Sequence, residues 1–85
     1  MKQVAKKEID RLAPVFEKIE VSNRDRAVEL FDFAKRYYSD SKYFFQKKKY
    51  VESFEAAIIS WAYIDIGLKL EFFKVPGELR KHFTV

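Results

Sequence analysis

Residues 50–73 read YVESFEAAIISWAYIDIGLKLEFF, and the rest of the chain is predicted to pack around this segment. It contains no proline, and its apolar residues recur every three or four positions, which is typical of a helix. At 100° per residue, one broad apolar face is predicted to point toward the core. Its members are Phe54, Ile58, Trp61, Ala62, Leu68 and Phe72.

Two further helices are predicted upstream. The first covers about residues 2–20, and Pro14 within it predicts a kink rather than a break into two helices. The second covers about residues 23–46 and is expected to start at Ser22, because Ser22 and Asp25 form an S-x-x-D capping pattern. Its apolar stripe is Ala27, Leu30, Phe31, Ala34, Tyr37, Tyr38, Ser41, Phe44 and Phe45.

The connections between these helices are short. Lys47-Lys48-Lys49 forms an exposed turn between the second and third helices, and Val75-Pro76-Gly77 ends the third. We therefore predict an all-α fold in which residues 1–85 form one antiparallel, up-down-up three-helix bundle. The tail, residues 74–85, is expected to pack back on the bundle.

Asp65 falls within the predicted core face of the third helix. A buried carboxylate needs a partner, and antiparallel packing brings the Tyr38 hydroxyl toward Asp65, with Lys69 as the other candidate. We interpret Asp65 and Tyr38 as buried polar groups that fix the helix register. The alternative is an acid–base role for Asp65, but no second carboxylate, histidine or nucleophile accompanies it on that face.

A second apolar stripe on the third helix lies about 90–120° around from the predicted core face. Its members are Ile59, Tyr63, Ile66 and Leu70. Either the tail residues Leu79, Phe83 and Val85 fold back over this stripe, or it is an interface with a protein partner or a second copy, or partial coverage by the tail is combined with dimerisation. The second explanation makes the chain a non-enzymatic protein-interaction or self-association module.

Basic residues suggest an alternative function as an RNA-binding adaptor. The net charge is +4, and lysines gather near one exposed tyrosine, a combination used to bind single-stranded RNA. The candidate residues are Lys35, Lys42, Tyr43, Lys47, Lys48 and Lys49. However, the 17 basic residues face 13 acidic ones, and a mixed surface of this kind is also typical of ordinary soluble proteins.

Residues that carry catalysis or bind metal are scarce. The chain has no cysteine, and its one histidine, His82, follows Arg80 and Lys81 in the tail. We expect no catalytic residues, no cofactor and no metal. The charged N-terminal segment is not a signal peptide, and the longest uncharged run, residues 56–64, is far short of the ~20 residues that span a bilayer. A cytoplasmic protein without membrane association is therefore expected.

Four segments resemble the archaeal domain of unknown function 357 family. They are AKRYYSDSKYF (residues 34–44), YVESFEA (50–56), WAYIDIGL (61–68) and FTV (83–85). The resemblance implies a small archaeal three-helix bundle with no assigned activity, so it supplies no catalytic residues. It also implies a glycine-containing turn between the second and third helices, where this chain has Lys47-Lys48-Lys49.

Overall fold

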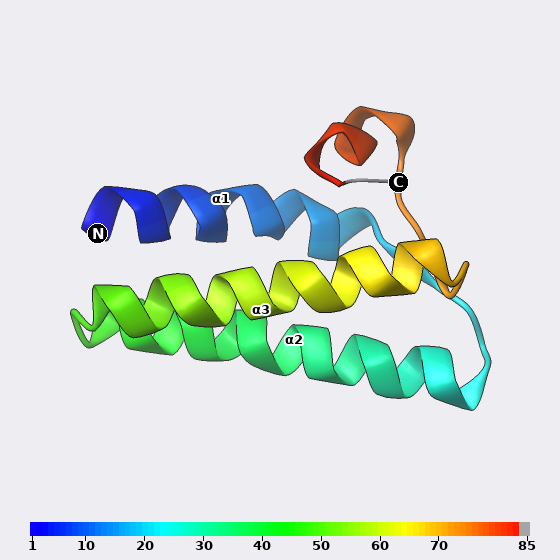
Figure 1. The fold of residues 1–85 in the computed structure, drawn as a ribbon, viewed down its shortest axis with the longest axis horizontal. Coiled ribbons are helices and arrows are strands. Elements are labelled where there is room, and N and C mark those ends of the chain that lie inside the picture. Colours follow the sequence, from blue (N-terminus) through cyan, green and yellow to red (C-terminus); the bar gives the residue numbers. More distant parts are fainter. Residues whose placement is uncertain (84–85) are drawn as a thin grey trace.

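The computed structural model describes residues 1–83 and is an up-down-up bundle of three long helices (Figure 1). The helices are α1 (Lys2–Lys18), α2 (Asp25–Gln46) and α3 (Tyr50–Lys69). Two short strands, β1 (Glu20–Val21) and β2 (Phe73–Lys74), and a 3₁₀ helix, η1 (Gly77–His82), complete the described chain. The predicted all-α, three-helix architecture is confirmed.

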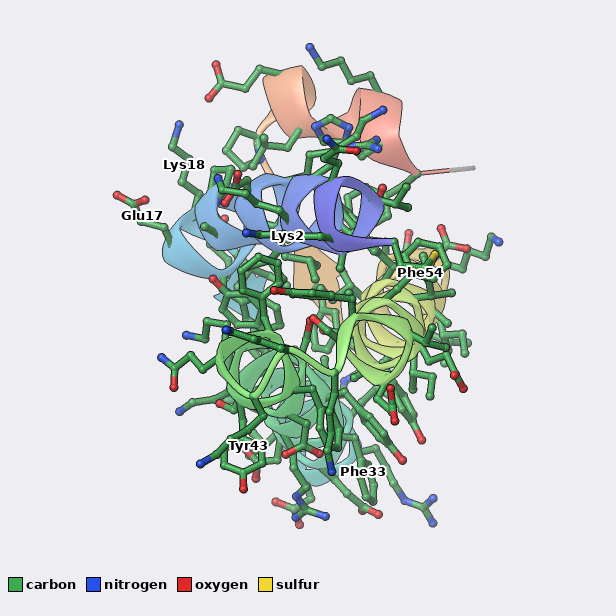
Figure 2. All side chains as sticks on the ribbon, turned by 90° about the vertical axis from the view of Figure 1, so that its left-hand side faces the viewer. Lys2, Glu17, Lys18, Phe33, Tyr43 and Phe54 are labelled. Carbon is green, nitrogen blue, oxygen red and sulfur yellow. The ribbon has the colours of Figure 1, made fainter. Side chains whose placement is uncertain are left out.

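Helix α1 continues unbroken through Pro14, so a split into two helices does not occur. Its buried side chains are Ala5, Leu12 and Val15. In both views α1 and η1 lie on the same side of the α2–α3 pair (Figures 1 and 2). The bundle thus consists of a closely packed pair, α2 and α3, with α1 packed along one side of it.

Helices α2 and α3 pack through small residues that repeat every seven positions. They are Ala27, Ala34 and Ser41 on α2, and Ser53, Ser60 and Gly67 on α3, all of them buried. Ser60 Oγ donates a hydrogen bond to the carbonyl oxygen of Ala34 at 2.7 Å, and Ser41 and Ser53 are bonded to each other one heptad away. A hydroxyl reaches the backbone of another helix only when the two helices lie close together, so these bonds mark a tight interface.

The predicted core face of α3 is therefore wrong. Ile58 is 42% exposed and Ala62 is also exposed, while the buried direction is rotated roughly 110° away from the predicted one. The prediction followed the largest side chains, whereas close packing against α2 requires the smallest. Trp61 and Leu68 pack at the edge of the core and remain half-buried.

The second helix does not start at Ser22. The N-cap of α2 is Arg24, whose backbone is extended and whose side chain makes no capping bond. Ser22 belongs to the end of the strand pair instead, because its N–H donates to the carbonyl oxygen of Phe72 at 2.8 Å. The antiparallel pairing of β1 with β2 thus holds the α1–α2 connection in place and takes Ser22 away from the helix end.

The third helix ends at Lys69 rather than at Phe73. Glu71 takes a left-handed backbone conformation (φ 61°), and the N–H of Phe72 returns to the carbonyl oxygen of Gly67 at 2.8 Å. This Schellman-type ending turns the chain into β2, which the sequence did not predict. Phe73 is then 2% exposed and lies directly over Gly67, where a Cβ would come within 2.1 Å of its ring.

The lysine turn between α2 and α3 closes in the same way. Lys48 has φ 61°, and the N–H of Lys49 donates to the carbonyl oxygen of Phe44 at 2.9 Å. The left-handed position is the one that glycine favours at a helix end. The hairpin therefore forms with a lysine at the left-handed position of a turn for which the family resemblance implied a glycine.

The tail packs back on the bundle as far as it is described. Leu79 is 7% exposed and joins the core cluster, and Lys18 forms an ion pair with Glu78 at 2.9 Å. Val85, which was expected to help cover the second stripe, lies outside the described residues.

Candidate interaction surface and Trp61 pocket

The outward side of α3 is apolar along its C-terminal half. Six residues between Ile58 and Leu70 are exposed, and five of them are apolar. We define the α3 outer face as these five residues: Ile58, Ile59, Ala62, Ile66 and Leu70. The four large side chains are 39–55% exposed, so the monomer leaves them in water.

The predicted stripe overlaps this face but is not identical to it. Ile59, Ile66 and Leu70 are exposed, whereas Tyr63 is half-buried. The Tyr63 ring stacks on Phe33 at a centroid distance of 5.6 Å and on Tyr37 at 5.8 Å. In Figure 2 Phe33 lies at the side of the bundle opposite α1. These aromatic contacts extend the apolar surface from α3 onto α2.

Residues 74–83 of the tail do not cover the stripe. Phe83 packs against Trp61 with ring centroids 5.2 Å apart, and Leu79 is buried in the core. At 100° per residue, Trp61 lies roughly 140° around α3 from Ile66. The explanation based on Leu79 and Phe83 is therefore wrong, and the α3 outer face remains open.

Asp65 and Tyr38 are not a buried polar pair. The Asp65 side chain is 24% exposed and accepts a hydrogen bond from Lys69 Nζ at 2.8 Å, which is the second of the two predicted partners. Tyr38 is half-buried and stacks on Phe16 of α1 at 4.6 Å. Burial, with a smaller contribution from the nearby Asp10 carboxylate, raises the pKa of the Tyr38 hydroxyl. Because the buried side of α3 differs from the predicted side, Asp65 lies away from the centre of the core.

Asp65 lines an open pocket of about 330 Å³ between α1, α3 and η1. Its other lining residues are Glu8, Arg11, Ile58, Trp61, Ala62, His82 and Phe83. The prediction considered only the helix face that carries Asp65, whereas folding brings His82 and Glu8 to the same pocket from other segments of the chain. We name this site the Trp61 pocket.

Arg11 is the central group of the Trp61 pocket. Its guanidinium lies 5.7 Å from the Trp61 ring, within cation–π range, and its Nη2 donates to His82 Nδ1 at 3.0 Å. Glu8 lies 3.4 Å from the same guanidinium. Among residues 1–83, the indole Nε1 of Trp61 is a buried donor with no acceptor.

Burial and the positive charges of Arg11 and Lys81 lower the pKa of His82, while Glu8 opposes them weakly. A neutral His82 can accept the Arg11 hydrogen bond at Nδ1 only when its own proton is on Nε2. The imidazole thus acts as an acceptor that holds η1 against α1. The pocket has an arginine, an imidazole and two carboxylates, and its lining residues within positions 1–83 include no serine, threonine or cysteine to serve as a nucleophile.

The family model described as Protein of unknown function (DUF357) matches residues 3–73 of the chain. The chain belongs to the DUF357 family. It is also similar to the crystal structure of protein AF1782 from the archaeon Archaeoglobus fulgidus, which is assigned to the same family. The TM-score is 0.76 at 25% identity, over 88% of this chain and 92% of that one. No curated protein matches the sequence.

The candidate nucleic-acid residues of this DUF357 protein lie along α2 and at its turn into α3. Tyr43 is 56% exposed, but Lys47 Nζ lies over its ring at 5.6 Å. Lys42 Nζ lies over the Tyr38 ring at 4.3 Å. A lysine of the same chain therefore occupies one face of each ring, and RNA binding stays a prediction.

No helix within residues 1–83 is long and apolar enough to cross a membrane. In the same part of the chain, no three acidic, histidine or cysteine side chains are grouped so that they could hold a metal ion.

Proposed function

We propose that this DUF357 protein is a non-catalytic module that self-associates through the α3 outer face. One observation carries the proposal: five of the six exposed residues between Ile58 and Leu70 are apolar. Solvent-exposed helix positions of a monomer are normally filled by lysine, glutamate and similar residues, and a largely apolar face usually marks an interface.

The proposal is supported by the rigid setting of the face. The opposite side of α3 is held to α2 by hydroxyl–carbonyl bonds at Ser53 and Ser60. The rings of Phe33 and Tyr37 on α2 stack against Tyr63 of α3 and so support the same surface. A face held in this way loses little conformational entropy on binding, which favours association.

Sedimentation velocity on the purified protein tests the proposal. We expect a species heavier than the 10.2 kDa monomer, and we expect the double substitution Ile59→Lys and Ile66→Lys to shift it to the monomer. The matched control is Val4→Lys with Val28→Lys, since both valines are 45% exposed on other helices and should leave the mass unchanged.

A nuclease step separates self-association from RNA binding. The heavier species should persist after nuclease treatment. If the heavier species disappears on this treatment, RNA bound at the lysine-rich surface of α2 would account for it, and self-association would be contradicted. A strictly monomeric wild-type protein over the micromolar range would contradict self-association.

A further inference from the structure

Two of the charged residues on the outward side of α3 are arranged symmetrically about Ala62. Glu55 and Lys69 are both exposed, and each stands seven residues from Ala62, one before it and one after it. At 1.5 Å per residue, each charge lies about 10.5 Å along the helix from Ala62. All three residues lie within roughly 20° of one line along the helix surface.

We infer that α3 pairs antiparallel with α3 of a second copy, across a two-fold axis at Ala62. This inference rests on the proposed self-association. In the antiparallel arrangement Glu55 faces Lys69 of the partner subunit, and the same contact recurs on the other side of the axis. A parallel pair would set Glu55 against the partner's Glu55 and Lys69 against the partner's Lys69, which is repulsive at both ends.

The apolar residues fit the same register. Ile59 lies three residues before Ala62 and Ile66 four residues after it, so Ile59 of one copy meets the partner's Ile66. Ala62 has the smallest side chain of the α3 outer face, and its position at the crossing point lets the two helices approach closely. Lys69 Nζ already binds Asp65 at 2.8 Å, and an ammonium group has three donors, so it can bridge Asp65 and the partner's Glu55.

Cysteine cross-linking tests the orientation, because the chain contains no cysteine of its own. Under mild oxidation Ala62→Cys should form a disulfide-linked dimer, since the two positions meet at the axis. Glu55→Cys should not cross-link to itself, because antiparallel pairing separates the two copies of that position by about 21 Å along the helix. The double variant Glu55→Cys with Lys69→Cys should cross-link again.

Charge reversal gives an independent readout. Glu55→Lys should weaken the dimer about tenfold, and adding Lys69→Glu should recover most of that loss. In a parallel dimer the single reversal would only exchange one repulsion for another and leave the affinity unchanged.

Sedimentation of the same variants separates the two proposals. A wild-type protein that is monomeric would overturn self-association and the orientation together. A wild-type dimer in which Glu55→Cys cross-links readily to itself, or in which the second charge reversal fails to restore affinity, would overturn the antiparallel arrangement alone.

Discussion

Ser41 and Ser53 bind each other's helices reciprocally. Ser41 Oγ donates to the Ser53 carbonyl oxygen at 2.9 Å, and Ser53 Oγ donates to the Ser41 carbonyl oxygen at 2.8 Å. Both side chains are fully buried, and a buried hydroxyl without a hydrogen-bond partner would be costly. Each hydroxyl finds its acceptor in the backbone carbonyl oxygen of the other serine. This pair sets the distance and the register between α2 and α3.

Substitutions at Ser41 should show that size matters more than polarity here. Ser41→Ala removes one hydrogen bond and should lower the free energy of unfolding by about 1 kcal/mol. Ser41→Leu should cost about 3 kcal/mol, although leucine is more apolar, because it forces the helices apart. Urea unfolding followed by circular dichroism, at one fixed protein concentration, measures both.

The matched control for Ser41 is Ser39, which is exposed on the same helix. Ser39→Ala and Ser39→Leu should each change stability by less than about 0.5 kcal/mol. If Ser41→Leu were as stable as Ser41→Ala, the close helix contact would be refuted.

Gly67→Ala should be strongly destabilising. The added Cβ would lie 2.1 Å from Phe73 Cδ2, and Phe73 is 2% exposed, so its ring has little room to move. We expect a loss of about 2–3 kcal/mol in the same unfolding experiment. Gly77→Ala is the control, because a Cβ at Gly77 would meet nothing within 4 Å. Equal effects at the two glycines would contradict this packing.

Lys48→Gly should stabilise the protein. Lys48 has φ 61°, a conformation that costs a residue with a Cβ roughly 1–2 kcal/mol, while glycine adopts it freely at a smaller entropic cost. The expected gain is about 0.5–1 kcal/mol, read as an increase in the melting temperature. Lys47→Gly should instead be neutral or destabilising, since Lys47 has an ordinary negative φ of −84°.

The contact of η1 with the bundle should depend on pH. His82 has a lowered pKa in the folded protein, so below its ordinary value of about 6.5 the unfolded chain binds more protons than the folded one. The stability that neutral His82 contributes is thus complete above about pH 6.5 and is lost as the pH falls through the folded-state pKa. Protonation also removes the acceptor for Arg11.

Trp61 reports this change directly, because it is the only tryptophan and His82 and Phe83 pack against it. On acidification below pH 6.5, its fluorescence should shift to the red as η1 leaves and water reaches the indole. The shift should be absent in His82→Gln, which does not titrate. An identical transition in that variant would assign the effect to another group.

Much of the fold could be predicted from the helical periodicity. The three helices follow from apolar residues spaced three and four apart, and the position of the turn between α2 and α3 follows from the lysine cluster. The heptad of Ser53, Ser60 and Gly67 was also visible, but large side chains carry more weight in a hydrophobic pattern than small ones. The rotation of α3 was missed for that reason.

The Trp61 pocket was not predictable from local pattern. Arg11 and His82 are 71 positions apart, and no spacing rule connects them. The strand pair was missed for a related reason, because two residues per strand leave no alternation to detect, and their pairing depends on where α1 and α3 end.

Helix formation and short connections depend on neighbours along the chain, so the bundle of three antiparallel helices is predictable from the sequence alone. Only the tertiary structure decided which side of α3 faces inward. That choice depends on how closely α2 can approach, and Ser41, Ser53 and Ser60 settle it through bonds across the interface. The same choice turns Ile59, Ile66 and Leu70 outward, where a second copy can cover them.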